Sequence, residues 1–133
     1  MIPREFPIGV GRAKLDVLVV EDEPVSRRAL SALMAARGCH TIAAGSAEDA
    51  LRHMRSAGTP RVALVDLDLP GMSGIDLIRK MTSDDPDVFA VLITAAADET
   101  VESIRKSGEV NYLPKPLDFD RLLTLLATAQ QVN

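Results

Sequence analysis

The sequence of 133 residues contains one cysteine, two histidines and no tryptophan. Cys39 cannot form an internal disulfide, and His40 and His53 do not provide the Cys/His spacing of a zinc site. The composition therefore excludes a domain held together by internal disulfides and gives no sign of structural zinc. A reducing compartment fits this cysteine usage, so we expect the protein in the cytoplasm.

Long apolar runs and an excess of positive charge are also missing. No stretch approaches the ~18 apolar residues that a membrane helix needs, so no membrane association is expected. The chain has 15 basic and 19 acidic residues, a net charge of −4, and its basic residues are scattered. Without a basic surface, direct nucleic-acid binding is not expected.

The length of the chain suits one domain with its own core. Residues 1–14 are rich in proline and glycine and lack the apolar segment of a secretory signal, which predicts an irregular N-terminal arm. We expect a single domain over residues 15–130 and a short tail at 131–133.

Five short apolar runs alternate with segments of helical period, a pattern typical of a parallel sheet covered by helices on both faces. The runs span residues 17–20, 41–44, 62–65, 88–93 and 110–113. The expected architecture is a flavodoxin-like, doubly wound α/β fold of five βα units, with strand order 2-1-3-4-5.

Short polar residues before the helical segments predict helix caps at Ser46 and Asp118. A third helix is expected after Ser73 and Gly74, and a fourth around residues 98–107. The first helix, beginning at Pro24, has apolar residues at helical spacing: Val25, Ala29, Leu33 and Met34. The last helix is expected to face the core with Phe119, Leu122, Leu123 and Leu126. The helix after Asp98 has only Val101 and Ile104 as clear apolar anchors, so we expect it to be the least stable.

Reactive side chains follow four of the five runs: Glu21, Asp22, Asp66, Thr94 and Lys115. The carboxyl ends of parallel strands meet at one edge of the sheet, where such folds bind ligands. Three carboxylates and one ammonium leave excess negative charge, and like charges ~4 Å apart repel by about 4 kcal/mol at an effective dielectric of about 20. A hard divalent cation, Mg²⁺ or Mn²⁺, is therefore expected at this edge.

A carboxylate, a divalent cation, a hydroxyl and a lysine are the parts needed for phosphoryl transfer to an aspartate. Two aspartates, Asp66 and Asp68, follow the third run in the stretch VALVDLDLPGMSG. Composition and spacing leave open which of them is the nucleophile. Arg27 and Arg28, on the first helix near the same edge, are interpreted as a solvated face rather than part of the site.

The Asp-x-Asp in this stretch resembles the first motif of the haloacid dehalogenase phosphatases. In that family the first aspartate is the nucleophile, the second is a general acid/base, and an acidic pair that binds Mg²⁺ comes later in the chain. Here Glu21 and Asp22 precede the motif, and only residues 116–133 follow Lys115. A phosphatase of this type is therefore the alternative interpretation.

The order acidic pair, aspartate, threonine, lysine resembles instead the receiver domain of bacterial two-component response regulators. The matching stretches are VLVVEDEP, ALVDLDLPGMSG, VLITA and YLPKPLD. This resemblance implies that Asp66 is the phosphoacceptor and that Asp22 binds Mg²⁺ directly. Glu21 is implied in the same acidic pocket, and Asp68 is implied to offer its backbone carbonyl to the metal.

The resemblance gives three further residues a role. Thr94 is the implied switch hydroxyl, Lys115 the phosphate-binding lysine, and Tyr112 the switch aromatic. The peptide bond between Lys115 and Pro116 is expected to be cis. Phosphorylation is expected to alter the surface formed by the last two helices and the strand between them.

The implied phosphoryl donor is a sensor histidine kinase or a histidine phosphotransfer protein, and the output partner is unknown. The resemblance implies a signalling switch rather than an enzyme, with phosphotransfer and self-dephosphorylation as its limited catalytic acts. It also allows a phosphorylation-dependent dimer, although Val110 and Asn111 replace acidic residues frequent in the dimerising subgroup. A degenerate receiver that only docks to a partner is the third interpretation.

Overall fold

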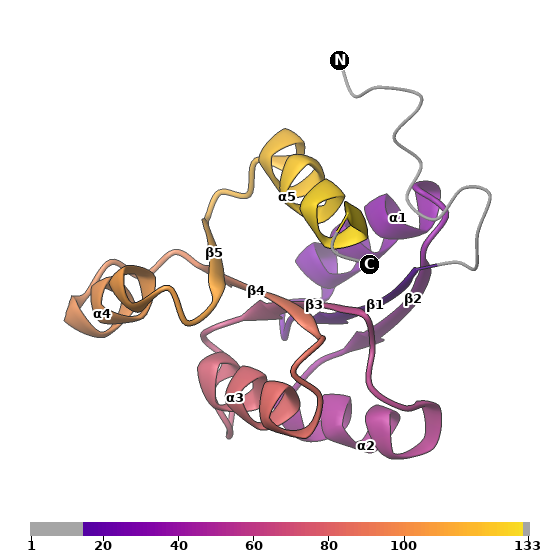
Figure 1. The fold of residues 1–133 in the computed structure, drawn as a ribbon, viewed down its shortest axis with the longest axis horizontal. Coiled ribbons are helices and arrows are strands. Elements are labelled where there is room, and N and C mark those ends of the chain that lie inside the picture. Colours follow the sequence, from indigo (N-terminus) through magenta and orange to yellow (C-terminus); the bar gives the residue numbers. More distant parts are fainter. Residues whose placement is uncertain (1–14, 132–133) are drawn as a thin grey trace.

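The structure, a computed structural model, describes residues 15–131. Its strands form one parallel sheet in the order β2-β1-β3-β4-β5, which confirms the predicted fold (Figure 1). The strands are β1 (Asp16–Val20), β2 (His40–Ala44), β3 (Val62–Asp66), β4 (Phe89–Thr94) and β5 (Asn111–Pro114). Each strand lies within one residue of its predicted position, because buried parallel strands are nearly continuous apolar runs.

Helices follow each of these strands: α1 (Pro24–Ala36), α2 (Ala47–Ala57), α3 (Gly74–Asp84), α4 (Glu99–Ser107) and α5 (Phe119–Gln131). The predicted caps at Ser46 and Asp118 are present. The side chains of four residues accept a hydrogen bond from the backbone N–H three positions on: Ser46, Ser73, Asp98 and Asp118. The cap of α1 is Glu23, which the sequence analysis missed. Backbone N–H groups of Ser26 and Val25 hydrogen-bond its carboxylate and lower the pKa of Glu23.

Two of the boundaries expected from the sequence fall near the limits of the described residues. Helix α5 includes Gln131, the first residue of the expected tail. The expected arm at residues 1–14 and the end of the tail lie outside the described part of the chain. Among residues 15–131, no helix combines the length and apolar character that crossing a bilayer requires.

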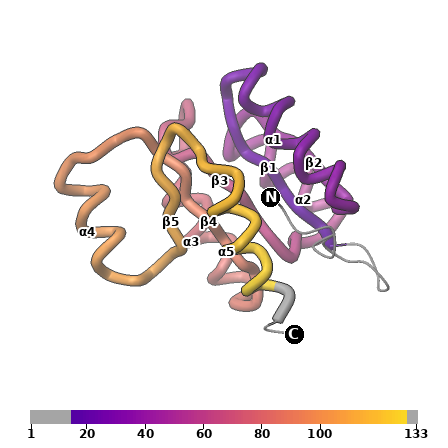
Figure 2. The backbone as a smooth tube through the Cα atoms, turned by 90° about the horizontal axis from the view of Figure 1, so that it is seen from above, coloured from indigo at the N-terminus to yellow at the C-terminus, as the bar shows by residue number. Residues whose placement is uncertain are grey.

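The helices cover both faces of the sheet. Figure 1 shows the sheet edge-on, with α1 and α5 on one face and α2 and α3 on the other. Helix α4 lies at the β5 side of the sheet, apart from the other helices in both views (Figures 1 and 2). All the loops that follow the strands therefore open at one edge of the sheet, because the strands are parallel.

Alternate residues along each strand pack into two different cores. In β1, Val17 and Val19 face one core and Leu18 and Val20 the other. The first core lies under α1 and α5 and includes Met34, Cys39, Leu64, Leu122 and Leu126. The second core lies under α2 and α3 and includes Leu77, Ile78, Met81, Leu92 and Ile104. Burial raises the pKa of the Cys39 thiol to about 11, so this cysteine is a packing residue with little thiolate at neutral pH.

Helix α4 is the shortest of the helices in residues 15–131, with nine residues. Val101 and Ile104 are its buried residues, as the sequence predicts. A bidentate ion pair joins α3 to the residues that follow α4, because Arg79 Nε and Nη2 donate to the Glu109 carboxylate at 2.6 and 3.1 Å. With so little buried surface, α4 is expected to open more readily than the other helices.

The expectation that Phe119 faces the core is wrong. Its side chain is 43% exposed, and Val25 at the start of α1 is 64% exposed. Both residues lie in the first turn of a helix that follows a strand, so both sit over the carboxyl edge of the sheet rather than over its centre. Helical spacing identifies the face of a helix, but it does not say where along the helix the sheet ends.

We predict that Leu64→Ala lowers the free energy of unfolding by about 2–5 kcal/mol, since it leaves a cavity in a fully buried part of β3. Phe119→Ala removes a larger but half-exposed side chain and is expected to cost about 1 kcal/mol or less. Urea unfolding of both variants measures the difference. Comparable losses would contradict the exposed position of Phe119.

Candidate functional site

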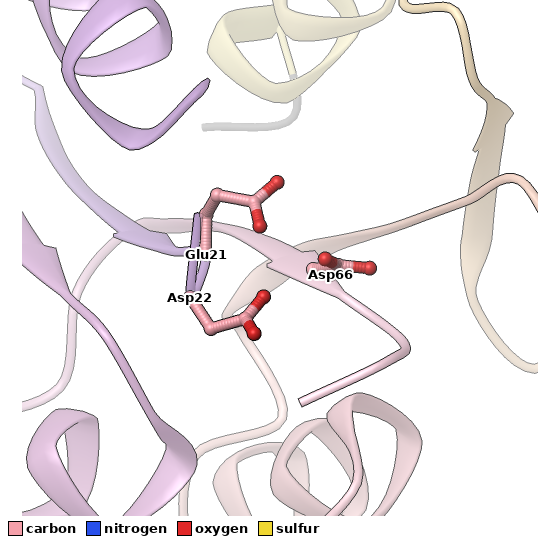
Figure 3. Close-up of side chains that lie close together, drawn as sticks. All are labelled: Glu21, Asp22 and Asp66. Carbon is pink, nitrogen blue, oxygen red and sulfur yellow. The ribbon is translucent and has the colours of Figure 1, made fainter. Parts of the chain in front are cut away.

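The carboxyl edge of the sheet brings the predicted acidic residues together. Glu21 and Asp22 directly follow β1, and Asp66 is the last residue of β3, the neighbouring strand. One carboxylate oxygen from each of these three residues lies within 4.8 Å of the others. Figure 3 shows the three carboxylates side by side at the strand ends.

Two of these carboxylates are nearly inaccessible to solvent. Glu21 is 6% exposed and Asp66 is 5% exposed, whereas Asp22 is exposed. Among the described residues, these two and Thr94 make up the buried polar and charged set. Buried charges are stable only when they are paired or coordinate a metal, so this edge of the sheet requires counter-charge.

Lys115 provides part of that counter-charge from the end of β5. Its Nζ lies 3.1 Å from Glu21 Oε1 and 3.2 Å from Asp66 Oδ2, so the ammonium bridges both buried carboxylates. Burial opposes its charge, but the hydrogen bonds and charges of Glu21 and Asp66 outweigh burial and raise the pKa of Lys115. The peptide bond from Lys115 to Pro116 is cis, as expected.

The charges do not balance within this cluster. Three carboxylates surround one ammonium, and at separations of a few ångströms each unpaired negative charge raises the energy of the others. Hard divalent cations bind a few carboxylate oxygens and keep several waters. The donor set of Glu21, Asp22 and Asp66 fits such a cation.

The two aspartates of the opening motif have different environments. Asp66 is buried, and its Oδ1 accepts a hydrogen bond of 3.1 Å from the backbone N–H of Asp68. The Asp68 side chain is exposed, so this residue contacts the site through its backbone. The structure therefore separates a buried carboxylate within the cluster from an exposed one outside it, which the sequence pattern left open.

The helix that follows Asp66 starts unusually close to it. A Cβ atom on Gly74 would lie 2.1 Å from the backbone oxygen of Asp66, so only glycine fits there. The N–H of Gly74 donates to the carbonyl of Leu67 at 3.0 Å and closes the loop. This contact holds the start of α3 against the end of β3 and fixes the backbone that carries Asp66.

Thr94 lies on β4, next to the strand of Asp66, and Tyr112 lies on β5, one strand further from Asp66. Thr94 ends β4, is fully buried, and its Oγ1 accepts a hydrogen bond of 3.0 Å from the N–H of Ala96. Its own O–H proton can still be donated to a ligand. Tyr112 is half-buried on β5 and lines a groove against α5 with Asp120 and Thr124. Tyr112 is thus placed beside the helix surface rather than among the carboxylates.

A cavity of about 260 Å³ opens beside the cluster, between the start of α1 and the loop before α5. Glu21, Asp66 and Lys115 form its polar part, while Leu30 and the half-exposed Phe119 belong to its apolar wall. The buried carboxylate of Asp66 is therefore reached through a mainly apolar opening.

Arg27 supports the site in a way that sequence reasoning missed. Its Nη1 donates to the backbone oxygens of Glu21 and Asp22 at 2.9 and 3.3 Å, and a Cβ on Gly45 would lie 3.1 Å from the same nitrogen. The interpretation of Arg27 as part of a solvated face is therefore wrong. A contact from an arginine to the backbone leaves no mark in charge pattern or periodicity, so no signal in the sequence pointed to it.

Comparison with known proteins identifies the family. The family model named response regulator receiver domain matches residues 17–127. The chain belongs to the response regulator receiver domains. Receiver domains are phosphoacceptor signalling domains rather than classical enzymes. In the sequence, the order of the motifs along the chain indicated this family. The Asp-x-Asp pattern alone would not have excluded a phosphatase.

Relatives of this receiver domain include complete regulators. It is 34% identical over 118 residues to the regulatory protein AtoC of Escherichia coli, covering 88% of this chain and 25% of AtoC. It is 36% identical over 110 residues to the two-component response regulator PhoP of Pseudomonas aeruginosa, covering 81% of this chain and 48% of PhoP. The chain therefore spans about half of these relatives or less.

Solved structures have the same fold. A response regulator receiver protein from Pseudomonas putida superimposes with a TM-score of 0.77 and 30% sequence identity, covering 87% of this chain and 98% of that protein. The receiver domain of an HD domain-containing protein from Pseudomonas fluorescens gives a TM-score of 0.80 at 25% identity, over 89% and 95%.

We expect Arg27→Ala to lower the free energy of unfolding by about 1–2 kcal/mol, because two backbone oxygens lose a charged donor. Arg28→Ala removes the same charge from the exposed neighbouring position and is expected to change stability by no more than about 0.5 kcal/mol. Urea unfolding compares them. Equal losses would show that the charge of α1, and not the backbone contact, stabilises the fold.

Proposed function

We propose that this receiver domain is a phosphorylation switch that accepts a phosphoryl group on Asp66. The observation that carries the proposal is the environment of this one carboxylate. Asp66 is buried, and its two oxygens are hydrogen-bonded by Lys115 Nζ and by the N–H of Asp68. These contacts hold the carboxylate in one orientation, with a cationic donor beside the place where a phosphoryl group would bind.

The proposed transfer moves one phosphoryl group between two side chains. A carboxylate oxygen of Asp66 attacks the phosphorus of a donor phosphohistidine, the new O–P bond forms, and the N–P bond breaks. The imidazole nitrogen of the donor keeps the electron pair of that bond, and the product is an acyl phosphate on Asp66. Lys115 is already in contact with Asp66, so its ammonium can offset charge on the phosphoryl oxygens.

The cation of this site is proposed to be Mg²⁺, with Mn²⁺ as a substitute. Carboxylates of Glu21, Asp22 and Asp66 would hold it, together with the backbone carbonyl of Asp68. When bound, Mg²⁺ offsets negative charge on the phosphoryl oxygens. The residues present are suited to this ion because all the donors are oxygens and three of them are charged.

The proposed response passes from Thr94 to the surface made by α4, β5 and α5. The buried hydroxyl of Thr94 would donate to the phosphoryl oxygen, a contact that exists only after transfer, so it biases the protein towards one conformation. Tyr112 lies half-buried in a groove of the same surface. Helix α4, the shortest of the described helices, is proposed to be the element that is displaced.

The donor is proposed to be a sensor histidine kinase or a histidine phosphotransfer protein, acting with this domain in the cytoplasm. Among the relatives of this domain, PhoP is described as a two-component response regulator and TorS as a sensor protein. Phe119 and Val25, the exposed large apolar residues of the described part of the chain, belong to the first turns of α5 and α1. Phe119 lines the cavity beside Asp66 and offers an apolar surface on which a donor could dock.

We predict that the wild-type domain is labelled once by acetyl phosphate in the presence of Mg²⁺ and that Asp66→Asn is not labelled. Asp68→Asn, two residues away, keeps the backbone carbonyl and the N–H to Asp66, so it retains the label. Intact mass measures all three proteins, and chelation of Mg²⁺ is expected to abolish labelling.

Two outcomes of this experiment favour the other interpretations. Continuous turnover of a small phosphate ester without a stable label would favour the haloacid dehalogenase type of phosphatase. Absence of both labelling and cation binding would leave a degenerate receiver that acts only by docking.

We expect Thr94→Val to keep most of the label on Asp66 but to lose the response of α4. Valine has nearly the shape of threonine and cannot donate to the phosphoryl group, so transfer and conformational change are separated. Hydrogen exchange of α4 with and without acetyl phosphate measures the response. Thr82→Val on α3, whose hydroxyl bonds the Ile78 carbonyl, is the control. An unchanged α4 response in Thr94→Val would exclude Thr94 as the switch.

A further inference from the structure

Helix α2 contacts the loop between β3 and α3. The strand before this helix, β2, ends without a titratable residue. β2 is followed by Gly45 and Ser46, and the first charged side chain is that of Glu48, the second residue of α2. The Oε2 atom of Glu48 accepts a hydrogen bond of 3.1 Å from the backbone N–H of Met72. A carboxylate of α2 therefore holds a loop that belongs to the neighbouring βα unit.

The backbone of that loop is shaped to receive Glu48. Gly71 has a φ of +74°, a conformation that favours glycine. A Cβ on Gly71 would also lie 2.9 Å from Glu48 Oε2 and 3.2 Å from Oε1. Glycine is thus required at this position twice, for the turn itself and for the approach of the carboxylate.

The same loop carries the backbone of the phosphoacceptor site. At its start, the N–H of Asp68 donates to Asp66 Oδ1 at 3.1 Å. At its end, the N–H of Gly74 donates to the Leu67 carbonyl at 3.0 Å. Met72 lies between these two fixed points, so the bond to Glu48 restrains the middle of the loop from outside.

We propose that Glu48 is a positioning residue of the phosphoacceptor site. By holding Met72, it keeps the loop in the conformation in which the Asp68 N–H faces Asp66 and the Asp68 carbonyl is available to a cation. Glu48 touches none of the reacting atoms and acts through the backbone. The inference rests on the proposed function, because that function gives the loop its cation and its phosphoryl group.

A simpler role for Glu48 is to stabilise the start of α2, since acidic residues favour the first turn of a helix. Asp49 lies in the same turn and carries the same charge, but its carboxylate pairs with Arg52 of the same helix at 2.8 Å. A role confined to the helix would therefore make Asp49→Ala affect the protein no less than Glu48→Ala, since only Asp49 also loses an ion pair within the helix. A role in the loop belongs to Glu48 alone.

Variants of these two residues test the inference: Glu48→Ala, Glu48→Gln and Asp49→Ala. Mg²⁺ is titrated into each ¹⁵N-labelled protein while the backbone amides are followed by NMR. We expect Glu48→Ala to raise the Mg²⁺ concentration at half-saturation about fivefold, the effect of one ordinary hydrogen bond, because Glu48 acts on the cation only through the loop. Asp49→Ala is expected to stay within about twofold of wild type, which is the effect of a surface charge.

A second measurement reports the hydrogen bond itself. In the absence of Mg²⁺, the Met72 amide is expected to exchange faster in Glu48→Ala than in wild type, and to keep its protection in Asp49→Ala. Glu48→Gln retains an oxygen that accepts the same bond, so it is expected to restore most of the protection and of the Mg²⁺ affinity. Loss of helix stability alone would change Asp49→Ala no less than Glu48→Ala.

The outcomes separate this inference from the proposed function. A wild-type domain that acetyl phosphate does not label would overturn the proposed function, whatever the variants show. A labelled wild type with Glu48→Ala matching it in Mg²⁺ affinity and Met72 exchange would overturn the inference alone. Equal defects in Glu48→Gln and Glu48→Ala would also overturn it, since they would assign the effect to charge rather than to the hydrogen bond.

Discussion

The pairing of two buried carboxylates with one ammonium is the interaction on which the rest of this structure depends. Glu21 and Asp66 are almost removed from solvent at the ends of adjacent strands, and Lys115 bridges them. Burying either charge without a partner would destabilise the fold by several kcal/mol. The sheet must therefore bring the end of β5 to the ends of β1 and β3, and this requirement links the strand order to the chemistry.

The raised pKa of Lys115 shows how this pairing depends on pH. A lysine whose folded pKa lies above its unfolded value of about 10.4 contributes its full stabilisation below that value. The contribution disappears only as the pH rises through the folded pKa. Around neutral pH the Lys115 ammonium is thus permanently charged, so the charge that it contributes to the carboxylate cluster is constant.

The regular parts of the fold could be predicted from the sequence because they depend on local signals. Apolar runs indicated the strands, and Ser46 and Asp118 indicated helix starts, because their side chains accept hydrogen bonds from nearby N–H groups. The acidic cluster followed from the rule that parallel strands end at one edge. Each of these inferences needed only neighbouring residues and a known strand order.

The remaining features depend on contacts between distant residues or on where the sheet ends. Arg27 was interpreted as a surface charge and Glu48 was not singled out, yet each hydrogen-bonds the backbone of a loop at the site. Backbone groups are the same at every position, so their partners cannot be identified from residue types. Phe119 had the correct spacing for burial but lies beyond the edge of the sheet.

The division of the strand side chains between two cores has a consequence for variation. Residues that pack under α1 and α5 share only strand backbone with those that pack under α2 and α3. Substitutions in the two layers should therefore combine almost additively, because they have few common neighbours. One layer can change to suit a new partner while the other keeps its packing, and the carboxylates at their common edge stay in place.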